Sequence, residues 1–580
     1  MKRTLGLALV AATATSLVAT AAVAAPTTTK SHDATAMQGQ GLAKGKGKAQ
    51  GPTVDLQILH TSDFHGHLEP SGGFGGAAYL AGLMDTLRTA NSVTLASGDI
   101  IGGSTFESGL FQDEPTIEVM NALGLDHSSV GNHEFDEGFS ELQRIIEGGN
   151  HPELGQFGDE PYAGTDFSYL GANVVYKDSG EAALPPYVVE NVRGVRVGVI
   201  GIVTSDTPIL VSPGGIADLA FLDEAETINR YAEELADQGV KVITVAMHEG
   251  GYDAGLYPKP VDPTDVNVGC DTLSGPILDI NAGVTAEVDV LMTGHTHNAY
   301  VCQLPDPEGV NRLVTSAGDW GRVLTELNLT VDRRTGDVVR EASGATNHVV
   351  VADETAAVNA EVADIVDYWV AQAAVVAGDV VGSVTEDILG DSSGDRGIET
   401  PMADLVADSI LWGTQDAGAQ ISFMNVGGVR DSFYYDEISA SEQPGEITYS
   451  EAYDVAPFGN LLVTLDLTGA DIEAILNQQY NEGRSRKVLA LGVSEGFTYS
   501  WDSTTNSVVP GSMMLDGVAI DPAATYKVST LNFLAEGGDG FTAFGNATAT
   551  VGGPEDLANL VNYLRAHSPV SPPADRVTGL

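Results

Sequence analysis

The sequence has few cysteines and few basic residues, and both shortages limit what the protein can do. Cys270 and Cys302 are the only cysteines among 580 residues, so a structural metal site built from four thiolates is excluded. Six of the 27 Lys and Arg residues lie among the first 52, which leaves residues 53–580 with 21 basic and 79 acidic groups and a formal charge of −58. Such a surface argues against binding of polymeric nucleic acid, although a small anionic substrate is compatible if metal ions supply positive charge.

Beyond the N-terminus the sequence lacks an apolar run long enough to span a bilayer. Residues 1–24 have the layout of a secretory signal, with Lys2 and Arg3 before an Ala/Leu/Val core and Ala22-Val23-Ala24 as a cleavage site. A membrane anchor is the alternative, but the Ala-rich core is only weakly apolar. We therefore expect cleavage, and a protein that is secreted or held in the cell envelope without a stable membrane anchor. Residues 25–52, rich in Thr, Gly, Lys and Gln, predict a disordered leader.

Export bears on the two cysteines, because disulfides persist in oxidising compartments. One Cys270–Cys302 disulfide is expected there, with two unrelated thiols as the alternative. The bridge would tie a loop to the residue five positions after His297 and would stabilise the turn at 294–297.

The length of the chain predicts more than one hydrophobic core. Short apolar runs alternate with helical patterns as far as about residue 339, which favours a layered α/β domain. Residues 354–377 have the pattern of one long amphipathic helix, and the alternation restarts near residue 380. We therefore predict a first domain at 53–350, a connector helix at 351–378 and a second domain at 379–580.

Polar residues with metal-binding side chains follow five separate apolar runs. In a layered α/β fold, ligands bind beyond the carboxyl ends of the strands, so these residues are expected to meet at one edge. The set comprises Asp63, His65, Asp99, Asn132, His248, His295 and His297. Singly, each has an ordinary structural alternative, such as a turn, a helix cap or a buried hydrogen-bonded histidine. Together they favour a metal centre, since five of the 12 histidines, the four in this set and His133, lie just past strand ends.

The composition of this set indicates which metals it would bind. Its donors are nitrogen and oxygen without thiolate, which suits divalent Zn, Mn or Fe. Seven ligands are too many for one tetrahedral ion, and they suit two ions that share a carboxylate. Gly98, Gly131 and Gly294 precede ligand residues and would let the backbone approach an ion closely.

The series Asp-x-His, Gly-Asp, Gly-Asn-His-Glu, His and Gly-His-x-His resembles the calcineurin-like metallophosphoesterase superfamily. The strings LHTSDFHG at 59–66 and GNHEFD at 131–136 are similar to those of secreted 5′-nucleotidases, and the resemblance extends from about residue 54 to the end. It implies a four-layer α+β first domain, in which helices flank a β-sandwich. It also implies a second α/β domain, the 5′-nucleotidase C-terminal substrate-binding domain, joined to the first by a helix.

The resemblance also implies a role for each residue of the metal centre. One ion would be held by Asp63, His65 and His297, the other by Asn132, His248 and His295, and Asp99 would bridge both. His133 would not be a ligand but a catalytic group over the substrate phosphate. Asp136 would orient its imidazole and favour the charged form.

In the second domain the resemblance implies an aromatic substrate site. Phe458 and Phe533, each in a Gly-rich loop, match phenylalanines that sandwich a nucleobase, although a loop phenylalanine is more often simply packed in a core. The other matches are Asn460 and Asp539 for base and ribose, Asn425 and Arg430 in a phosphate-binding loop, and Arg396 as a second phosphate arginine. Bacterial members often carry a further arginine where this chain has Ser392 and Ser393, so phosphate binding would be weaker or shared differently.

The leading hypothesis is an exported enzyme with two divalent ions that removes the 5′-phosphate from nucleotides by attack of an activated water. Alternatives on the same fold are a UDP-sugar hydrolase, a 2′,3′-cyclic-nucleotide phosphodiesterase/3′-nucleotidase, and a sulfur-ester hydrolase, which Phe458 and Phe533 disfavour. An alternative of another class is a non-catalytic surface protein that binds nucleotides. The complete ligand set argues against this last alternative.

Overall fold

The computed structural model describes residues 52–580 except 153, 212, 254–265, 268–269, 391–394, 439–441 and 485. The predicted signal at 1–24 lies outside the described residues, as do almost all of the predicted leader at 25–52 and both Ser392 and Ser393. Residues 51–580 form one compact unit. None of the helices in the described ranges combines the length and the hydropathy needed to cross a bilayer.

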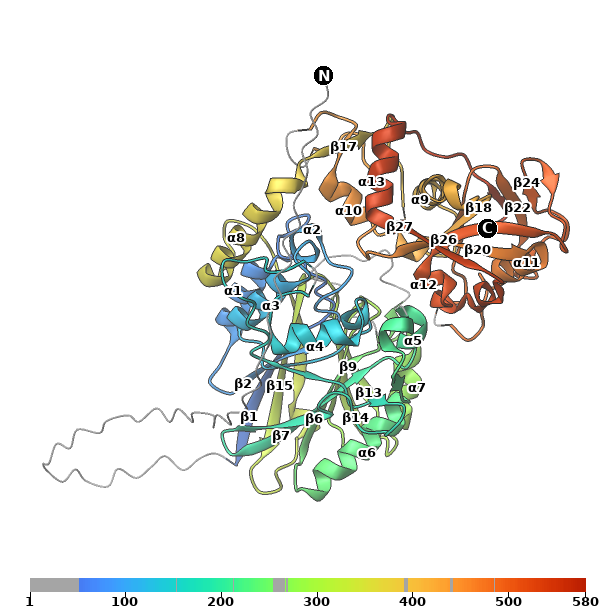
Figure 1. Cartoon of the computed structure of the whole chain (residues 1–580). Coiled ribbons are helices and arrows are strands. Elements are labelled where there is room, and N and C mark those ends of the chain that lie inside the picture. The colour runs from blue at the N-terminus through green and yellow to red at the C-terminus, as the bar shows by residue number, and fades with distance from the viewer. Residues whose placement is uncertain are drawn as a thin grey trace, which may run out of the picture. The chain divides into compact units, whose positions relative to one another are not determined.

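The first domain contains two six-stranded sheets, coloured from blue to yellow in Figure 1. The first sheet, in spatial order, consists of β16 (Gly344–Val349), β15 (Val323–Asp332), β1 (Thr53–Thr61), β2 (Ser92–Ser97), β3 (His127–Ser129) and β4 (Ser168–Leu170). The second consists of β13 (Ala299–Pro305), β14 (Asn311–Ala317), β12 (Val290–Thr293), β9 (Val242–His248), β7 (Val195–Val203) and β6 (Tyr187–Val192).

Most strands in each sheet run parallel, with antiparallel strands at the edges. The strands β1 to β4 are parallel neighbours, and so are β7, β9, β12 and β14. The strands β15, β16, β6 and β13 pair antiparallel. Because parallel strands end at the same edge of a sheet, each sheet presents several carboxyl ends together.

Apolar side chains join the two sheets face to face. Leu56 and Leu95 of the first sheet and Val199 and Val290 of the second belong to one buried cluster. Helices cover the outer faces, with α1 (Ala77–Leu87) and α3 (Glu114–Leu123) on the first sheet and α6 (Glu224–Asp237) and α7 (Pro276–Gly283) on the second. The four-layer arrangement predicted from the family resemblance is confirmed.

The connector is helix α8 (Ala360–Ala377), which begins later than the helix predicted at 354–377. Asn359 is extended and its side chain accepts a hydrogen bond from the Val362 backbone N–H at 3.1 Å, so it caps the helix and fixes its start. Val366 packs in the core of the first domain. Trp369 packs in a second core together with Phe111 and residues beyond 380, so α8 is anchored on both sides.

The second domain, orange to red in Figure 1, is built around a five-stranded mixed sheet. Its strands, in spatial order, are β21 (Leu491–Val493), β18 (Ile421–Asn425), β26 (Thr525–Leu531), β20 (Leu461–Thr468) and β27 (Thr550–Glu555). Helices α9 (Pro401–Gly413) and α13 (Asp556–His567) pack on one face and α11 (Gly469–Asn477) on the other. The predicted second α/β domain is therefore confirmed.

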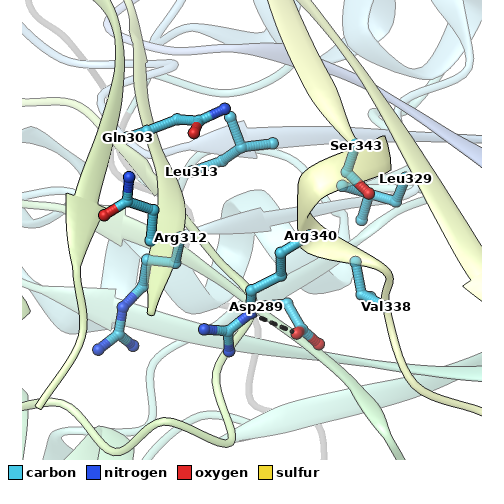
Figure 2. A pocket seen from close by; sticks show the side chains of 9 residues that line it. Asp289, Gln303, Arg312, Leu313, Leu329, Val338, Arg340 and Ser343 are labelled. Carbon is cyan, nitrogen blue, oxygen red and sulfur yellow. Dashed lines mark hydrogen bonds and ion pairs between the residues drawn. The ribbon is translucent and has the colours of Figure 1, made fainter. Parts of the chain in front are cut away.

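Two features stabilise the first domain around its second sheet. Cys270 and Cys302 form the predicted disulfide, with Cα atoms 5.3 Å apart. A charged network lies near the start of β14, where Arg340 pairs with Asp289 at 3.1 Å and Asp306 at 2.8 Å, as Figure 2 shows for Asp289. Buried Arg312, which lines the same small pocket, donates to the Val284 carbonyl after α7 at 2.7 Å. These contacts give the pocket a structural role.

Trp369→Ala is expected to lower the urea midpoint of unfolding. Trp369 is buried, its ring centroid lies 4.9 Å from that of Phe111, and its Nε1 donates to Glu118 at 2.7 Å. Truncation of such a side chain costs about 3–5 kcal/mol. Val375→Ala on the same helix is the matched control, since Val375 is 77% exposed. Equal midpoints for the two variants would contradict a stabilising role of α8 at this position.

Candidate metal centre

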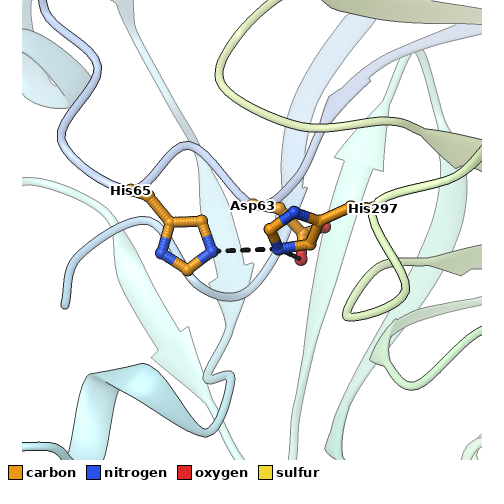
Figure 3. Close-up of side chains that lie close together, drawn as sticks. All are labelled: Asp63, His65 and His297. Carbon is orange, nitrogen blue, oxygen red and sulfur yellow. Dashed lines mark hydrogen bonds and ion pairs between the residues drawn. The ribbon is translucent and has the colours of Figure 1, made fainter. Parts of the chain in front are cut away.

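The seven predicted ligand residues lie at the carboxyl ends of five strands from both sheets. They follow β1, β2, β3 and β12, except His248, which is the last residue of β9. The donor atoms of six of them form two clusters, each with atoms within 4.8 Å of one another: Asp63, His65 and His297 in the first, and Asp99, His248 and His295 in the second. Figure 3 shows the first cluster, in which Nε2 of His65 lies 3.2 Å from Nε2 of His297. The face-to-face packing of the sheets thus brings together residues more than 200 positions apart.

Asp99 links the two clusters. Its Oδ2 lies 3.0 Å from Nε2 of His248 in the second cluster and 3.7 Å from Nε2 of His65 in the first. Its other oxygen accepts the backbone N–H of His133 at 2.9 Å, which places Asn132 beside the same carboxylate. This position between the clusters is the one that a shared ligand requires.

The backbone of the centre is held in an unusual conformation. Five of the seven residues have positive φ: Asp63 (51°), His65 (49°), Asp99 (48°), His295 (68°) and His297 (57°). Residues other than glycine seldom adopt such angles, and they do so mostly at functional sites where neighbouring structure enforces them. Here hydrogen bonds between loops enforce them, such as the Asp63 N–H to the Gly98 carbonyl (3.0 Å) and the His295 N–H to Asp63 Oδ1 (2.9 Å).

Glycines allow these loops to approach one another, as the sequence predicted. A Cβ on Gly131 would lie 2.2 Å from Asp99 Oδ1, and one on Gly294 would lie 2.9 Å from Asp63 Oδ2. Neither contact is sterically possible. Any larger residue at these two positions would therefore displace a ligand carboxylate.

Hydrogen bonds to Nδ1 fix the orientation of three of the predicted ligand histidines. Nδ1 lies 2.7 Å from the Gly102 carbonyl in His65, 2.7 Å from the Ser97 carbonyl in His248 and 3.1 Å from Asp319 Oδ2 in His297. These partners can only accept, so Nδ1 carries the hydrogen in each case. The Nε2 atom of each ring is then directed into its cluster, the orientation that a metal-binding histidine needs.

The donor atoms fit a pair of divalent ions. Asp63 Oδ2 and Asn132 Oδ1 are buried and have no hydrogen-bond partner among the residues that the structure describes. Buried polar atoms without partners are costly, and cations satisfy them. Nitrogen and oxygen donors without sulfur suit Zn, Mn or Fe.

The pKa shifts in the two clusters also favour binding of divalent cations. Burial raises the pKa of Asp63 to about 7 even though His248 opposes the shift. Burial lowers the pKa of His65 and His295 to about 3, which keeps both imidazoles in the neutral form that binds metal. Burial also opposes the charge of Asp99, but His248 and His133 outweigh it and hold the pKa of Asp99 well below its usual value.

His133 and its predicted partner Asp136 lie together beside the first cluster. His133 Nδ1 is 2.7 Å from Asp136 Oδ2, and its ring centroid is 5.1 Å from that of His65. Burial lowers the pKa of His133, but the carboxylates of Asp136 and Asp99 outweigh burial and raise it. The imidazole is partly exposed, so a substrate can reach it.

Two further residues support the centre, and the sequence reasoning assigned them no role. Glu134 accepts the backbone N–H groups of Asp99 (2.9 Å), Ile100 (2.8 Å) and Gly131 (2.5 Å), so its carboxylate joins the loops after β2 and β3. Asp319 orients His297. Glu134 lies inside the Gly-Asn-His-Glu string, and Gly318-Asp319 follows a strand just as Gly98-Asp99 does, so both carried a usable signal.

The predicted substrate residues of the second domain fall into two groups. Phe458 lies beside His133, with ring centroids 5.9 Å apart and planes 14° apart, and the Arg430 guanidinium lies 5.5 Å from the Phe458 centroid. In the other group, Asn425 Nδ2 donates to Asp539 Oδ2 at 2.8 Å, and Arg396 acts electrostatically on Asp539.

The two remaining predicted residues lie near these groups. Phe533 packs against Gly538, next to Asp539. The Asn460 carbonyl accepts the Asp556 N–H at 2.8 Å. A sandwich of Phe458 and Phe533 around a base stays a prediction.

Comparisons with known proteins agree with this geometry. Two family models match the chain: calcineurin-like phosphoesterase over residues 56–299 and 5′-nucleotidase, C-terminal domain, over residues 380–546. The chain is 32% identical to cell wall protein Lmo0130 of Listeria monocytogenes, over 89% of this chain and 68% of that protein. It is also 32% identical to endonuclease YhcR of Bacillus subtilis over 88% of this chain, but spans only 40% of the length of that relative. The crystal structure of a 5′-nucleotidase precursor from Thermus thermophilus is similar with a TM-score of 0.71 and 27% identity, covering 90% of this chain and 99% of that one.

Glu134→Gln is expected to weaken metal binding by about 10–100-fold, the usual effect of removing a group that positions ligands. The glutamine amide presents an N–H donor where the carboxylate accepts three backbone N–H groups. Titration calorimetry of the metal-free protein with Mn²⁺ measures the change. Glu137→Gln is the matched control, because Glu137 is exposed three residues further on. Equal Mn²⁺ affinity in the two variants would contradict the role of Glu134.

Proposed function

The chain belongs to the 5′-nucleotidase family of metal-dependent phosphoesterases, and we propose that it is an exported enzyme that removes the 5′-phosphate from nucleotides. The observation that carries this proposal is the position of Phe458. This aromatic residue of the second domain lies beside His133 of the metal centre, so a group able to stack a base is next to the phosphate chemistry. A base stacked there is joined to its 5′-phosphate by a ribose, which spans a short distance.

We assign the two donor clusters to two divalent ions, the cofactors that this superfamily uses. Asp63, His65 and His297 would hold one ion, Asn132, His248 and His295 the other, and Asp99 would be shared. When bound, such ions lower the pKa of a water and offset the negative charge of a phosphoryl group. The positive-φ loops and the Nδ1 hydrogen bonds preorganise the donors, so little reorganisation is needed on binding.

His133 would supply a proton or a positive charge to the reacting phosphate. Asp136 holds Nδ1, which leaves Nε2 directed away from Asp136 and available to the leaving oxygen. Charge in phosphoryl transfer spreads over the peripheral oxygens, and a fixed cation stabilises it. Arg430, which acts electrostatically on His133 and His65, would add a second positive charge at the phosphate.

The second domain would bind the nucleoside. Phe458 and Phe533 would stack the base, and Asp539, held by Asn425, would accept hydrogen bonds from ribose hydroxyls. Asn460 would contact the base, and Arg396 would add charge for the phosphate. Export would follow from cleavage after residue 24, and a relative named as a cell wall protein supports a location outside the cytoplasm.

His133→Asn is expected to retain both metal ions and to lower kcat for 5′-AMP by about 10²–10⁴-fold, the usual contribution of general acid catalysis. Phosphate release measures kcat, and elemental analysis measures the metal content. His151→Asn, at a histidine in another surface loop, is the matched control. An unchanged kcat in His133→Asn would remove this residue from the mechanism, and phosphate release that survives EDTA would refute the metal-dependent proposal as a whole.

Phe533→Ala is expected to lower kcat/KM for 5′-AMP by about 5- to 150-fold, since each stacked base contributes roughly 1–3 kcal/mol. Hydrolysis of p-nitrophenyl phosphate, which has no base or ribose, should change little. The same assay with UDP-glucose and 2′,3′-cyclic AMP separates a 5′-nucleotidase from the two alternatives on this fold. Equal losses for 5′-AMP and p-nitrophenyl phosphate would contradict a base-binding role.

A further inference from the structure

Arg484 is a buried cation that lacks the hydrogen bonds expected of it. Its side chain lies in the loop after α11 and the residue is only 7% exposed. Nη1 donates to the Gln479 carbonyl at 3.3 Å, but Nε and Nη2 have no acceptor among the described residues. An unpaired buried guanidinium is costly, and departures of this kind concentrate at functional sites.

The unpaired edge of Arg484 faces the turn Gly538–Gly540 (η6), which carries Asp539. A Cβ on Gly540 would lie 3.1 Å from Nη2 and 3.2 Å from Nε, so the guanidinium rests directly on this turn. On the other side, a Cβ on Gly538 would lie 2.5 Å from the Phe533 ring. The turn is therefore clamped between the Phe533 ring and the Arg484 guanidinium.

Asp539 has a backbone conformation that neighbouring structure has to enforce. Asp539 has φ of 54° between two glycines, a conformation that costs a non-glycine residue energy unless its surroundings enforce it. Phe541, the first residue after the turn, is fully buried, and the Arg484 guanidinium lies 5.0 Å from its ring centroid. Arg484 thus contacts the turn at Gly540 and holds the residue that follows it.

Arg484 also affects the charge of Asp539. Burial raises the pKa of Asp539, and four groups oppose the shift: Arg396, the Asn425 hydrogen bond, Arg484 and Arg486. Burial lowers the pKa of Arg484, and Asp539 opposes that shift in turn. Asp539 itself is partly exposed, so a ligand can reach the carboxylate whereas Arg484 stays behind it.

We propose that Arg484 is a positioning residue for the nucleoside end of the substrate, which holds the Gly538–Gly540 turn and supplies positive charge behind the Asp539 carboxylate. The carboxylate then accepts hydrogen bonds from the vicinal ribose hydroxyls in a fixed direction. Arg484 acts through Asp539 and does not touch the phosphate. The inference rests on the proposed function, in which Asp539 binds ribose, and it extends that function to a preference for substrates with both ribose hydroxyls.

The test compares Arg484→Met and Arg484→Lys in the full-length, metal-loaded enzyme. The substrates are 5′-AMP, 2′,3′-dideoxy-AMP and p-nitrophenyl phosphate. Lys487→Met is the matched control, because it removes a charge from the same loop at a side chain that is 54% exposed. If Arg484→Met does not fold, Arg484→Gln replaces it, since its amide can still donate to the Gln479 carbonyl.

Arg484→Met is expected to raise KM for 5′-AMP about tenfold, the loss of roughly one charge-assisted hydrogen bond, and to leave kcat little changed. KM for 2′,3′-dideoxy-AMP and kcat/KM for p-nitrophenyl phosphate should not change. Arg484→Lys should restore most of the affinity for 5′-AMP. In Arg484→Met, KM for 5′-AMP should begin to rise at a higher pH on acidification than in the wild type, because only Arg396, Arg486 and the Asn425 hydrogen bond then oppose protonation of Asp539.

Equal effects of Arg484→Met on all three substrates, or none on 5′-AMP, would overturn the inference, because a merely structural role does not distinguish ribose hydroxyls. Asp539→Asn distinguishes a failure of the proposed ribose binding by Asp539 from a failure of the proposed role of Arg484. If it raises KM for 5′-AMP and Arg484→Met does not, only the role of Arg484 is wrong. If Asp539→Asn also leaves KM unchanged, or the wild type does not hydrolyse 5′-AMP, ribose binding at Asp539 and this inference are both wrong.

Discussion

The metal centre depends on one constraint: carboxylates that are buried together need positive charge nearby in order to stay ionised. Asp63 and Asp99 are almost fully inaccessible at the ends of two neighbouring strands. An uncompensated charge in such a place costs several kcal/mol. Two sheets packed face to face are an efficient way to satisfy the constraint, because each contributes strand ends to the same place, so that the predicted ligands would surround the ions from both sides. The packing of the two sheets thus brings donor atoms that are distant in the sequence to one place, where the same positive charge can compensate all of them.

The same constraint explains why the loops are strained and tightly bonded to each other. A donor set that is to close around ions must point inward, and left-handed backbone at five of the predicted ligand positions turns the side chains that way. Each such residue costs of order 1–3 kcal/mol, so the loops have to be held from outside. Glu134 does this with three backbone hydrogen bonds across two loops. Burial raises the pKa of Glu134 to about 7. The residue that holds the two loops therefore also pays an energetic cost for burying its carboxylate.

The sequence predicted features that depend on neighbouring residues in the chain, but it did not predict contacts between segments that are distant in the sequence. Ligand candidates such as Asp63 and His295 could be identified because each follows an apolar strand, and strand ends meet at one edge whatever the exact packing. The start of α8 was placed too early, because the apolar pattern continues upstream of Asn359 and only the side-chain cap ends the helix there. The position of Arg484 behind Asp539 left no trace in the sequence, since the contact joins a loop after a helix to a turn 55 residues later. The division of the donors into two clusters came from the family resemblance, because spacing alone does not order loops around an ion.

Because basic residues are scarce, the arginines of the second domain are an important source of local positive charge. With a formal charge of −58 on residues 53–580, the surface repels phosphate esters at long range, and salt shortens that repulsion to roughly 8–10 Å. Near Asp539, three arginines, Arg396, Arg484 and Arg486, act on one carboxylate, and Arg430 lies at Phe458. Positive charge is therefore concentrated where a single nucleotide would lie. A polymer bound there would extend beyond this region onto acidic surface, whereas a mononucleotide is about as small as the screening length. Under the proposed function, this charge distribution would favour a mononucleotide over a polymer, independently of any base contact.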